Sequence, residues 1–372
     1  MRICHITTAH PEKDIRIFYK ECISLARAGF HVSLVVNGGV SKFSEGVHIV
    51  GFKKIKNRWL RIILSPWIAL IHALRINARV YHFHDPELLI TVLILRLFGK
   101  KVIYDVHENI RLSINEKTWI PSFLRYFLTK AFTLFERFIL IFIHQLILAE
   151  KSYLKFYPPK KSTVVLNFPL DKKGAVSKNF NNSIRLIYAG AIEKERGVEQ
   201  MLELFFFLVE NNYDVYFDMA GLIFDDQVEK KIRHFMKSPK MKHRFIYHGY
   251  IPIDKVYELL EKAHIGFSLL APKKNFLESY PTKIFDYMLF GIPVIASDFD
   301  LYKEIVENNN AGICVNYFDL EQIKKVFVDL MNHREILKKY SDCGIKAAKA
   351  RYLWKNQAEI LIKEYKTILY EK

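Results

Sequence analysis

Two series of alternating β-prone and helical segments, separated by a polar stretch, constrain the fold of this chain most strongly. Residues 14–28 show the pattern: apolar side chains recur at helical spacing, and Gly29 ends the segment. Residues 168–183 combine Pro, Gly, Asn, Ser and charges, as linkers do. Such alternation predicts parallel sheets with helices on both faces. The predicted strands are 2–7, 31–36, 80–84, 102–105 and 145–148 in the first series, and 184–189, 215–219, 245–247, 265–269, 294–296 and 312–315 in the second.

The length of 372 residues allows two domains with separate cores. We predict an α/β fold with a first domain over 1–170, a linker over 171–183 and a second domain over 184–351. Residues 352–372 have the period of a final helix. The four cysteines lack metal or disulfide spacing, which favours a reducing cytoplasm. The first strand begins at once, so we expect no signal peptide.

The segment 278–297, ESYPTKIFDYMLFGIPVIAS, has the order that a nucleotide site in an open α/β sheet needs. Glu278 is followed, after seven intervening residues, by Asp286. An apolar run, the turn Gly291-Ile292-Pro293 and a β-branched strand come next. A loop and a helix N-terminus supply N–H groups for phosphate, and carboxylates accept hydrogen bonds from sugar hydroxyls. The alternative is a surface helix with two solvated acids.

This segment resembles the E-x7-E signature of the retaining glycosyltransferases of GT-B type that are grouped as family 4. In that pattern a second acid, a Met and G-x-P-V follow the first Glu, and here Asp286, Met288 and Gly291 to Val294 match. The resemblance implies two Rossmann-like domains that face each other across a cleft, with the final helix crossing back to the first. It assigns Glu278 to the donor sugar and Asp286 to the ribose. The shorter Asp leaves the preference for base and ribose open.

The resemblance extends to a loop for the donor diphosphate in YAGAIEKERGVEQ, residues 188–200. Gly190 and Gly197 keep their places and Arg196 stands where a Lys is usual, whereas Ala191 replaces the usual Arg. One of two cations is therefore missing, and either Lys283 or Lys194 could take its place. The base is expected against Tyr250, where an aromatic ring can stack.

In the first domain, IYDVHEN (103–109) ends a strand with His107, which family members often use to face the donor sugar. Imidazole can hydrogen-bond a sugar hydroxyl with little charge cost near neutral pH. The alternative is a structural turn residue. We predict that His107 and Glu278 position the sugar while the leaving phosphate helps to deprotonate the acceptor.

The first loop, TTAHPEKDIRIFYKE (7–21), resembles a bacterial subgroup with a D-x-R-I-F-x-K-E run. His10, Asp14 and Arg16 could meet an acceptor phosphate, although Asp14 could instead cap the helix. His84 belongs to a second strand-end cluster, YHFHDPELL (81–89), which is either acceptor-side or structural. It contains an H-x-H pair that resembles part of a metal site, but no third ligand is evident.

Asp298-Phe299-Asp300 spells D-x-D, a metal–diphosphate signature of the other major glycosyltransferase fold. It follows the last motif strand, so helix capping is the preferred interpretation. We predict metal-independent catalysis with no cofactor, the nucleotide sugar being a substrate.

The formal net charge of +17 requires an anionic partner or surface. Basic residues lie among aromatic ones in 52–79 and 119–147, and we expect these segments to lie in an anionic membrane interface. We expect neither segment to span a membrane, because neither holds an uninterrupted run of apolar residues of the length that a transmembrane helix needs. No nucleic-acid-binding motif is present. The aromatic residues expected to reach deepest are Trp59, Trp67, Phe127 and Phe132.

These observations predict a cytoplasmic transferase at the inner face of the plasma membrane. It would move a sugar from a nucleotide sugar to a lipid-linked or saccharide acceptor in bacterial surface-polysaccharide synthesis, as O-antigen, capsule or exopolysaccharide. Two alternatives stay open. One is a nucleotide-sugar 2-epimerase of the same fold, and the other is a non-catalytic peripheral membrane partner.

Overall fold

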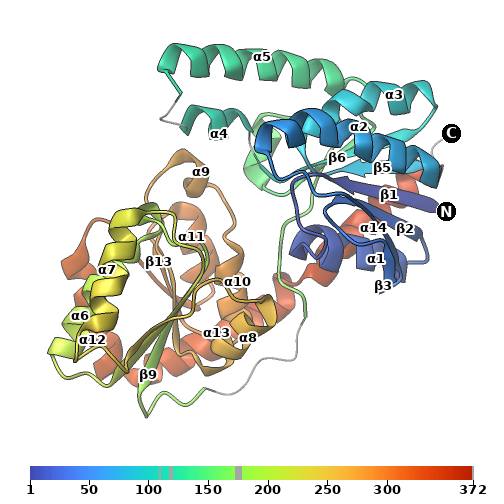
Figure 1. Cartoon of the computed structure of the whole chain (residues 1–372). Helices are drawn as coiled ribbons and strands as arrows, with labels where there is room; N and C mark the ends of the chain where they lie inside the picture. The colour runs from blue at the N-terminus through green and yellow to red at the C-terminus, as the bar shows by residue number, and fades with distance from the viewer. Residues whose placement is uncertain (109, 117–119, 172–177, 371–372) are drawn as a thin grey trace. The chain divides into compact units, whose positions relative to one another are not determined.

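A computed structural model describes residues 1–108, 110–116, 120–171 and 178–370. The chain forms two compact units (Figure 1). Unit 1 comprises Met1–Asn167 and Trp354–Lys372, and unit 2 comprises Phe168–Leu353. Each unit holds one α/β layer structure around its own sheet, and the predicted fold class is confirmed. Residues 172–177 of the predicted linker and Trp119 lie outside the described residues.

The sheet of unit 1 has the order β3-β4-β2-β1-β5-β6-β7-β8. Its strands are β1 Arg2–Thr7, β2 His31–Asn37, β3 Lys42–Ser44, β4 Val47–Phe52, β5 Val80–Phe83, β6 Lys101–Val106, β7 Gln145–Leu148 and β8 Ser162–Val164. All neighbours pair in parallel except β3 and β4. Because β1, β5 and β6 are adjacent and parallel, the loops that follow them meet at one edge.

Helices cover both faces of this sheet, with α2 and α3 on one face and η1, α1 and α14 on the other (Figure 1). The helical segments of unit 1 are η1 Ile15–Cys22, α1 Ile23–Arg27, α2 Arg58–Ile76, η2 Pro86–Thr91, α3 Val92–Leu97, α4 Ile110–Glu116, α5 Ser122–Leu140, η3 Lys151–Lys155, η4 Pro159–Lys161 and α14 Trp354–Tyr370. The segment η1 is π-helical, and Asp14 caps it by accepting hydrogen bonds from the backbone N–H groups of Arg16 and Ile17.

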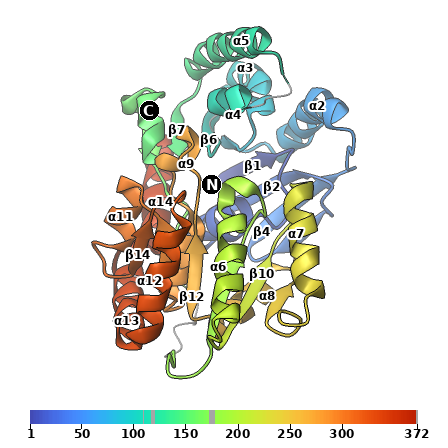
Figure 2. The same ribbon diagram turned by 90° about the vertical axis from the view of Figure 1, so that its left-hand side faces the viewer.

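The sheet of unit 2 is parallel, in the order β11-β10-β9-β12-β13-β14. Its strands are β9 Ile184–Ala189, β10 Val215–Ala220, β11 Phe245–Tyr247, β12 Ile265–Ser268, β13 Val294–Ser297 and β14 Gly312–Val315. Figure 2 shows α12, α6 and α7 side by side over one face. The helical segments of unit 2 are η5 Lys194–Arg196, α6 Val198–Glu210, α7 Asp226–Lys237, α8 Ile253–Lys262, α9 Lys274–Leu277, α10 Thr282–Leu289, α11 Asp300–Val306, α12 Leu320–Asn332 and α13 Arg334–Arg351.

Two features differ from the sequence-based expectation. The hairpin β3–β4 was not predicted, because β3 has three residues and is largely exposed, which leaves no periodic pattern. Its turn has positive φ at Glu45 and Gly46, as tight hairpins require. The predicted capping by the D-x-D aspartates is also wrong: the cap residue of α11 is Phe299, and Asp300 stands in the first turn, where its charge favours the helix dipole.

Helix α2 differs from the expectation that residues 52–79 hold no apolar run long enough to span a membrane. Among the described residues, its stretch Trp59–Ile76 is long and apolar enough to cross a membrane by length and composition. Ala69, Leu70 and Ala73 of this helix are nevertheless buried in the core of unit 1. One face of α2 therefore belongs to the core of the unit.

Candidate active site

In unit 1, the carboxylate of Asp85 organises the loop that follows β1. Its Oδ2 atom accepts hydrogen bonds from the Thr7 hydroxyl at 2.8 Å, the Thr8 amide at 2.6 Å and the Ala9 amide at 3.2 Å. Asp85 is the second residue after β5, so it connects the ends of two adjacent strands. This arrangement fixes the backbone that leads to His10.

His10 and His107, two predicted site residues, contact each other at this edge. Their Nε2 atoms lie 2.9 Å apart. His10 Nδ1 lies 3.5 Å from Asp14 Oδ2, and His10 Nε2 lies 3.4 Å from Asp85 Oδ1. Burial lowers the pKa of His10, but the hydrogen bond to Asp14 and the charges of Asp85 and Asp14 outweigh it and raise this pKa to about 9. On its other side, His107 Nδ1 lies 3.3 Å from Asp105 Oδ2.

Asp105, inside β6, is the centre of the buried part of this edge. Arg16 donates two hydrogen bonds to it, at 2.9 and 2.7 Å, and a third to the Val165 carbonyl at 3.0 Å. His84 Nδ1 lies 3.2 Å from Asp105 Oδ2. Burial raises the pKa of Asp105, but the Arg16 guanidinium holds it well below its usual range.

These contacts change the predicted role of Arg16 and favour the structural alternative for His84. Both side chains are buried, and both are directed to Asp105. A direct contact with an acceptor phosphate does not fit this placement, so they act by positioning Asp105 and, through it, His107. Asp14 combines both predicted roles, because one oxygen caps η1 and the other faces His10.

In unit 2, Lys283 and Gly190 form the core of the candidate diphosphate site. Gly190 follows β9 with a φ of +149°, and a Cβ placed on it would lie 3.0 Å from Lys283 Nζ. The ammonium lies 3.9 Å from the centre of the Tyr188 ring. Lys283 Nζ is buried and has no hydrogen-bond partner among the described residues. Burial and the charge of Arg196 hold the pKa of Lys283 well below its usual range.

The second candidate cation, Lys194, is placed differently. Its side chain is 60% exposed and its Nζ lies 3.6 Å from Glu199 Oε2. Arg196 lies over the Phe276 ring, 5.5 Å from its centre. Gly197 has a φ of +69°, and a Cβ on it would lie 2.5 Å from the Cβ of Leu269, so packing as well as conformation requires glycine. Lys283 is thus the lysine that the fold brings to Gly190.

The motif segment forms a loop that follows α9, then α10, the G-x-P turn and β13, in the predicted order. Glu278 is exposed at the end of α9, whereas Asp286 is half-buried on α10. Gly291 ends α10 with a φ of +67°, which explains the glycine of the G-x-P turn. Tyr250 is 76% exposed and follows Gly249, also at positive φ. An exposed ring beside an open backbone is a surface on which a base could stack.

Sequence reasoning assigned no role to Asp105 or Tyr188. A charged residue inside an otherwise apolar strand is the signal that could have identified Asp105, because buried carboxylates need partners. Tyr188 directly precedes the Ala-Gly of the diphosphate loop. Its ring contact with Lys283 joins residues 95 positions apart (283 − 188), which no local pattern indicates.

Comparison with known proteins defines the class of this fold. Residues 171–350 match the family described as Glycosyl transferases group 1. A search of the curated proteins found no match.

Solved structures of GT-B glycosyltransferases share the fold over nearly the whole chain. Sucrose-phosphate synthase from Thermosynechococcus elongatus has a TM-score of 0.75 at 14% identity, with 99% of both chains covered. Anabaena HepE, solved in complex with UDP-glucose, has a TM-score of 0.68 at 11% identity, with 99% of this chain and 100% of that chain covered. WaaG, a glycosyltransferase involved in lipopolysaccharide biosynthesis, has a TM-score of 0.70 at 13% identity, with 96% and 99% covered.

Proposed function

We propose that this protein is a retaining glycosyltransferase that transfers a sugar from a nucleotide-sugar donor to a lipid-linked or saccharide acceptor. The observation that carries the proposal is the buried ammonium of Lys283, which lies at Gly190 without a hydrogen-bond partner among the described side chains and backbone groups. An unpaired buried cation beside a glycine loop is a site for an anion. The match of residues 171–350 to a glycosyltransferase family supports the donor diphosphate as this anion.

The residues of unit 2 have distinct roles in this proposal. Lys283 and Arg196 stabilise the negative charge that grows on the diphosphate as the glycosidic bond breaks, which is where preorganised cations contribute most. Glu278 binds the hydroxyls of the donor sugar, and Asp286 binds the ribose. Tyr250 stacks on the base. The complex of Anabaena HepE with UDP-glucose supports a nucleotide-sugar donor.

The residues of unit 1 serve the acceptor. His107, oriented by Asp105, hydrogen-bonds the sugar or the reacting hydroxyl, and the cationic His10 attracts an anionic acceptor group. The leaving phosphate assists in deprotonating the acceptor. None of these steps requires a divalent metal ion at the diphosphate.

The test is a screen of the purified protein against UDP-, GDP- and ADP-sugars, followed by turnover assays of Glu278→Ala. We expect one donor class to bind, and Glu278→Ala to lower turnover by roughly 100-fold while the protein stays folded, because Glu278 is exposed. Glu258→Ala, at another exposed glutamate, is the matched control.

Wild-type turnover in Glu278→Ala would contradict the site assignment. Turnover of the donor to an isomeric nucleotide sugar without an acceptor would identify a 2-epimerase instead. Absence of binding to all three donor classes would favour the non-catalytic alternative.

The proposed location is the inner face of the plasma membrane, through the exposed apolar faces of α2 and α5. Phe132 packs partly against the core, so it does not belong to this surface as predicted. Lys53, Lys54 and Lys56 are exposed just before α2. The exposed large hydrophobic residues are Trp59, Leu60, Ile63, Leu64, Trp67 and Ile71 on α2, and Phe123, Leu124, Tyr126, Phe127, Leu128, Leu134, Phe135 and Phe138 on α5.

Vesicle flotation tests this surface. Reversal of the three lysines to glutamate should weaken binding to anionic vesicles by roughly tenfold or more, because basic residues are attracted to an anionic surface. The same reversal at the exposed Lys230, Lys237 and Lys242 of unit 2 changes the net charge equally and should weaken binding less. Equal effects of the two triple variants would contradict a specific surface.

The involvement of WaaG in lipopolysaccharide biosynthesis supports a role in surface-polysaccharide synthesis.

A further inference from the structure

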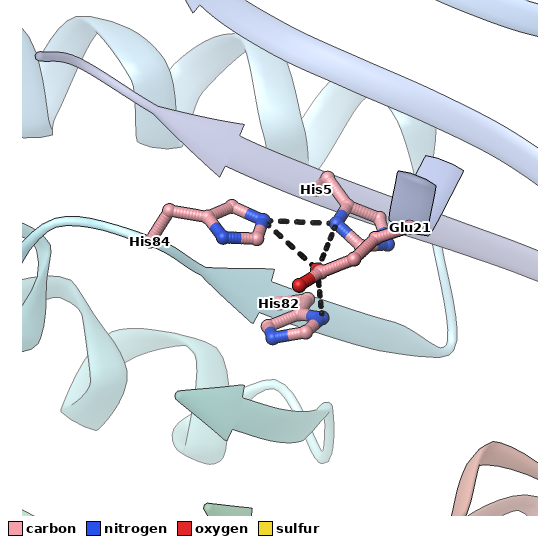
Figure 3. Close-up of side chains that lie close together, drawn as sticks. All are labelled: His5, Glu21, His82 and His84. Atoms are coloured by element: carbon pink, nitrogen blue, oxygen red, sulfur yellow. Dashed lines mark hydrogen bonds and ion pairs between the residues drawn. The ribbon is translucent and has the colours of Figure 1, made fainter. Parts of the chain in front are cut away.

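Three histidines and a glutamate meet inside unit 1, next to Asp105 of the candidate site. We call them the histidine–glutamate cluster: His5 on β1, Glu21 on η1, His82 on β5 and His84 directly after β5 (Figure 3). All four side chains are buried. Each offers one ligand atom, and these atoms lie within 4.8 Å of one another.

The carboxylate of Glu21 lacks the partners that a buried carboxylate needs. Neither of its oxygens has a hydrogen-bond partner among the described residues, and the same holds for His82 Nε2. Arg16 Nε lies 3.1 Å from Glu21 Oε1, but the hydrogen bonds of its guanidinium go to Asp105 and Val165. Buried polar atoms without hydrogen bonds are rare and each requires an explanation, such as an ion.

The spacing of the cluster fits a four-coordinate metal ion. Glu21 Oε2 lies 3.9 Å from His5 Nδ1, 3.9 Å from His82 Nδ1 and 4.0 Å from His84 Nε2. His5 Nδ1 and His84 Nε2 are 2.9 Å apart. Tetrahedral ligands bound to zinc at about 2.0–2.1 Å are roughly 3.3 Å from each other. The observed separations lie on both sides of that value and the remaining pairs of ligand atoms lie within 4.8 Å, so the side chains would have to move together around the ion to complete the geometry.

The second ring nitrogens of two of these histidines have the partners that metal-ligating histidines use. His5 Nε2 lies 3.1 Å from the Tyr365 hydroxyl on α14, and His84 Nδ1 lies 3.2 Å from Asp105 Oδ2. Such partners fix the ring and leave the other nitrogen free for the ion. His82 Nδ1 lies 2.7 Å from the same Tyr365 hydroxyl, and it would exchange this contact for the metal.

We propose that the histidine–glutamate cluster binds a Zn²⁺ ion through His5, His82, His84 and Glu21. Imidazole and carboxylate ligands suit this ion. The cluster is buried, so the ion enters as unit 1 folds and joins β1, β5 and η1 as a structural site. This role is separate from the proposed transfer chemistry, whose diphosphate residues belong to unit 2.

A neighbouring group shares His84 but is a weaker site. His84, Asp105 and His107 could also hold an ion. The Arg16 guanidinium donates hydrogen bonds to both oxygens of Asp105, so an ion there would have to displace them, whereas no such bond occupies the oxygens of Glu21. An ion in the histidine–glutamate cluster would be lost in a variant of Glu21 and kept in a variant of His107. An ion held by His84, Asp105 and His107 would show the reverse.

The test measures the metal content of protein expressed in zinc-supplemented medium and then dialysed against a chelator. We expect about one zinc per chain in the wild type, and a loss of at least about ten-fold in Glu21→Gln, since ligands of a structural site determine metal affinity. His107→Gln is the matched control and should keep its zinc.

Protein expressed with Co²⁺ in place of zinc supplies a second measurement that needs no variant. The wild type should show the strong visible absorption of four-coordinate Co²⁺ with nitrogen and oxygen ligands. This spectrum tests metal binding by the cluster even if Glu21→Gln does not fold. Folded wild type with less than about a tenth of an equivalent of zinc and no cobalt band would overturn the proposal. Zinc lost equally from His107→Gln would also overturn it. Neither measurement depends on glycosyltransferase activity.

Discussion

The two sheet edges differ in whether their buried cation has a partner within the protein. In unit 1, Arg16, Asp105 and the surrounding histidines contact one another, and the cation at the centre has its anion within the protein. In unit 2, the Lys283 ammonium is buried against the Tyr188 ring with no hydrogen-bond partner in the described part of the chain. The Arg16–Asp105 pair of the first edge is complete without a ligand, whereas the proposed anionic ligand would supply the missing partner of Lys283 at the second edge. Removing a charge should therefore damage stability in unit 1 and binding in unit 2.

The largest effect is expected for Asp105→Asn. This change removes the carboxylate that accepts the hydrogen bonds of the buried Arg16 and leaves only Glu21 as an opposite charge. Breaking one partner of a buried ion pair costs about 3–5 kcal/mol in the free energy of unfolding. Urea denaturation measures the change. Asp226→Asn, at an exposed residue of α7, is the control and should leave the transition nearly unchanged. A stability of Asp105→Asn within the error of wild type would show that the first edge is not held together by charge.

Lys283→Met should have the opposite effect to Asp105→Asn: it should weaken donor binding without lowering the stability of the protein. Replacing an unpaired buried ammonium with an apolar side chain of similar length should leave the free energy of unfolding unchanged or raise it by about 1 kcal/mol. Donor affinity should fall roughly 10- to 100-fold, since hydrogen bonds to charged groups contribute about 1.5–3 kcal/mol. Calorimetric titration with the donor nucleoside diphosphate measures the loss. The exposed Lys194→Met is the control, and an equal loss in that variant would contradict the role of Lys283.

The lowered pKa of Lys283 makes donor binding depend on pH. Burial and Arg196 lower the pKa of Lys283 in the free protein, and a bound diphosphate raises it again because it favours the charged form. Binding therefore takes up a proton at pH values above the lowered pKa. Affinity should be greatest below that pKa and should decline as pH rises above it. Titrations at one pH in buffers of different ionisation enthalpy count the protons, and Lys283→Met should abolish the uptake.

The smallest effect is expected at His10, which belongs to the complete edge but is partly exposed. Its pKa is raised to about 9 in the folded protein, above the value of about 6.5 in the unfolded chain. The stability that His10 contributes is therefore fully present below pH about 6.5 and is lost as pH rises through about 9. We expect a loss of about 1 kcal/mol over this range, measured by urea denaturation, and none in His10→Gln. An unchanged pH profile in His10→Gln would show that other groups are responsible.

Much of the fold and of the second edge was predictable because its signals are local. Apolar runs and the turns after them place β1, β9 and β13, and the G-x-P turn needs its glycine for a single positive φ. Lys283 was a candidate for the missing cation because it lies at the start of a helix next to the acidic motif. The structure adds that its ammonium meets Gly190.

The first edge was less predictable because its contacts join distant parts of the chain. The pairs Arg16–Asp105 and His5–His84 are 89 and 79 residues apart. The H-x-H pair was visible in the sequence, but its other two candidate ligands are on β1 and η1, and only the parallel pairing of β1 with β5 brings them together. Burial of Arg16, which changed its predicted role, is likewise a property of the packed unit.

The Tyr365 hydroxyl, which reaches both His5 and His82, has a consequence for biosynthesis. Unit 1 cannot obtain this group until the ribosome has made all of Phe168–Leu353, the residues of unit 2. At translation rates of about 5–20 residues per second, this takes about 10–40 s. The nascent first unit must wait, with α14 missing from its sheet, while the second unit is free to fold ahead of it. The unit that is synthesised first is thus the one that is finished last.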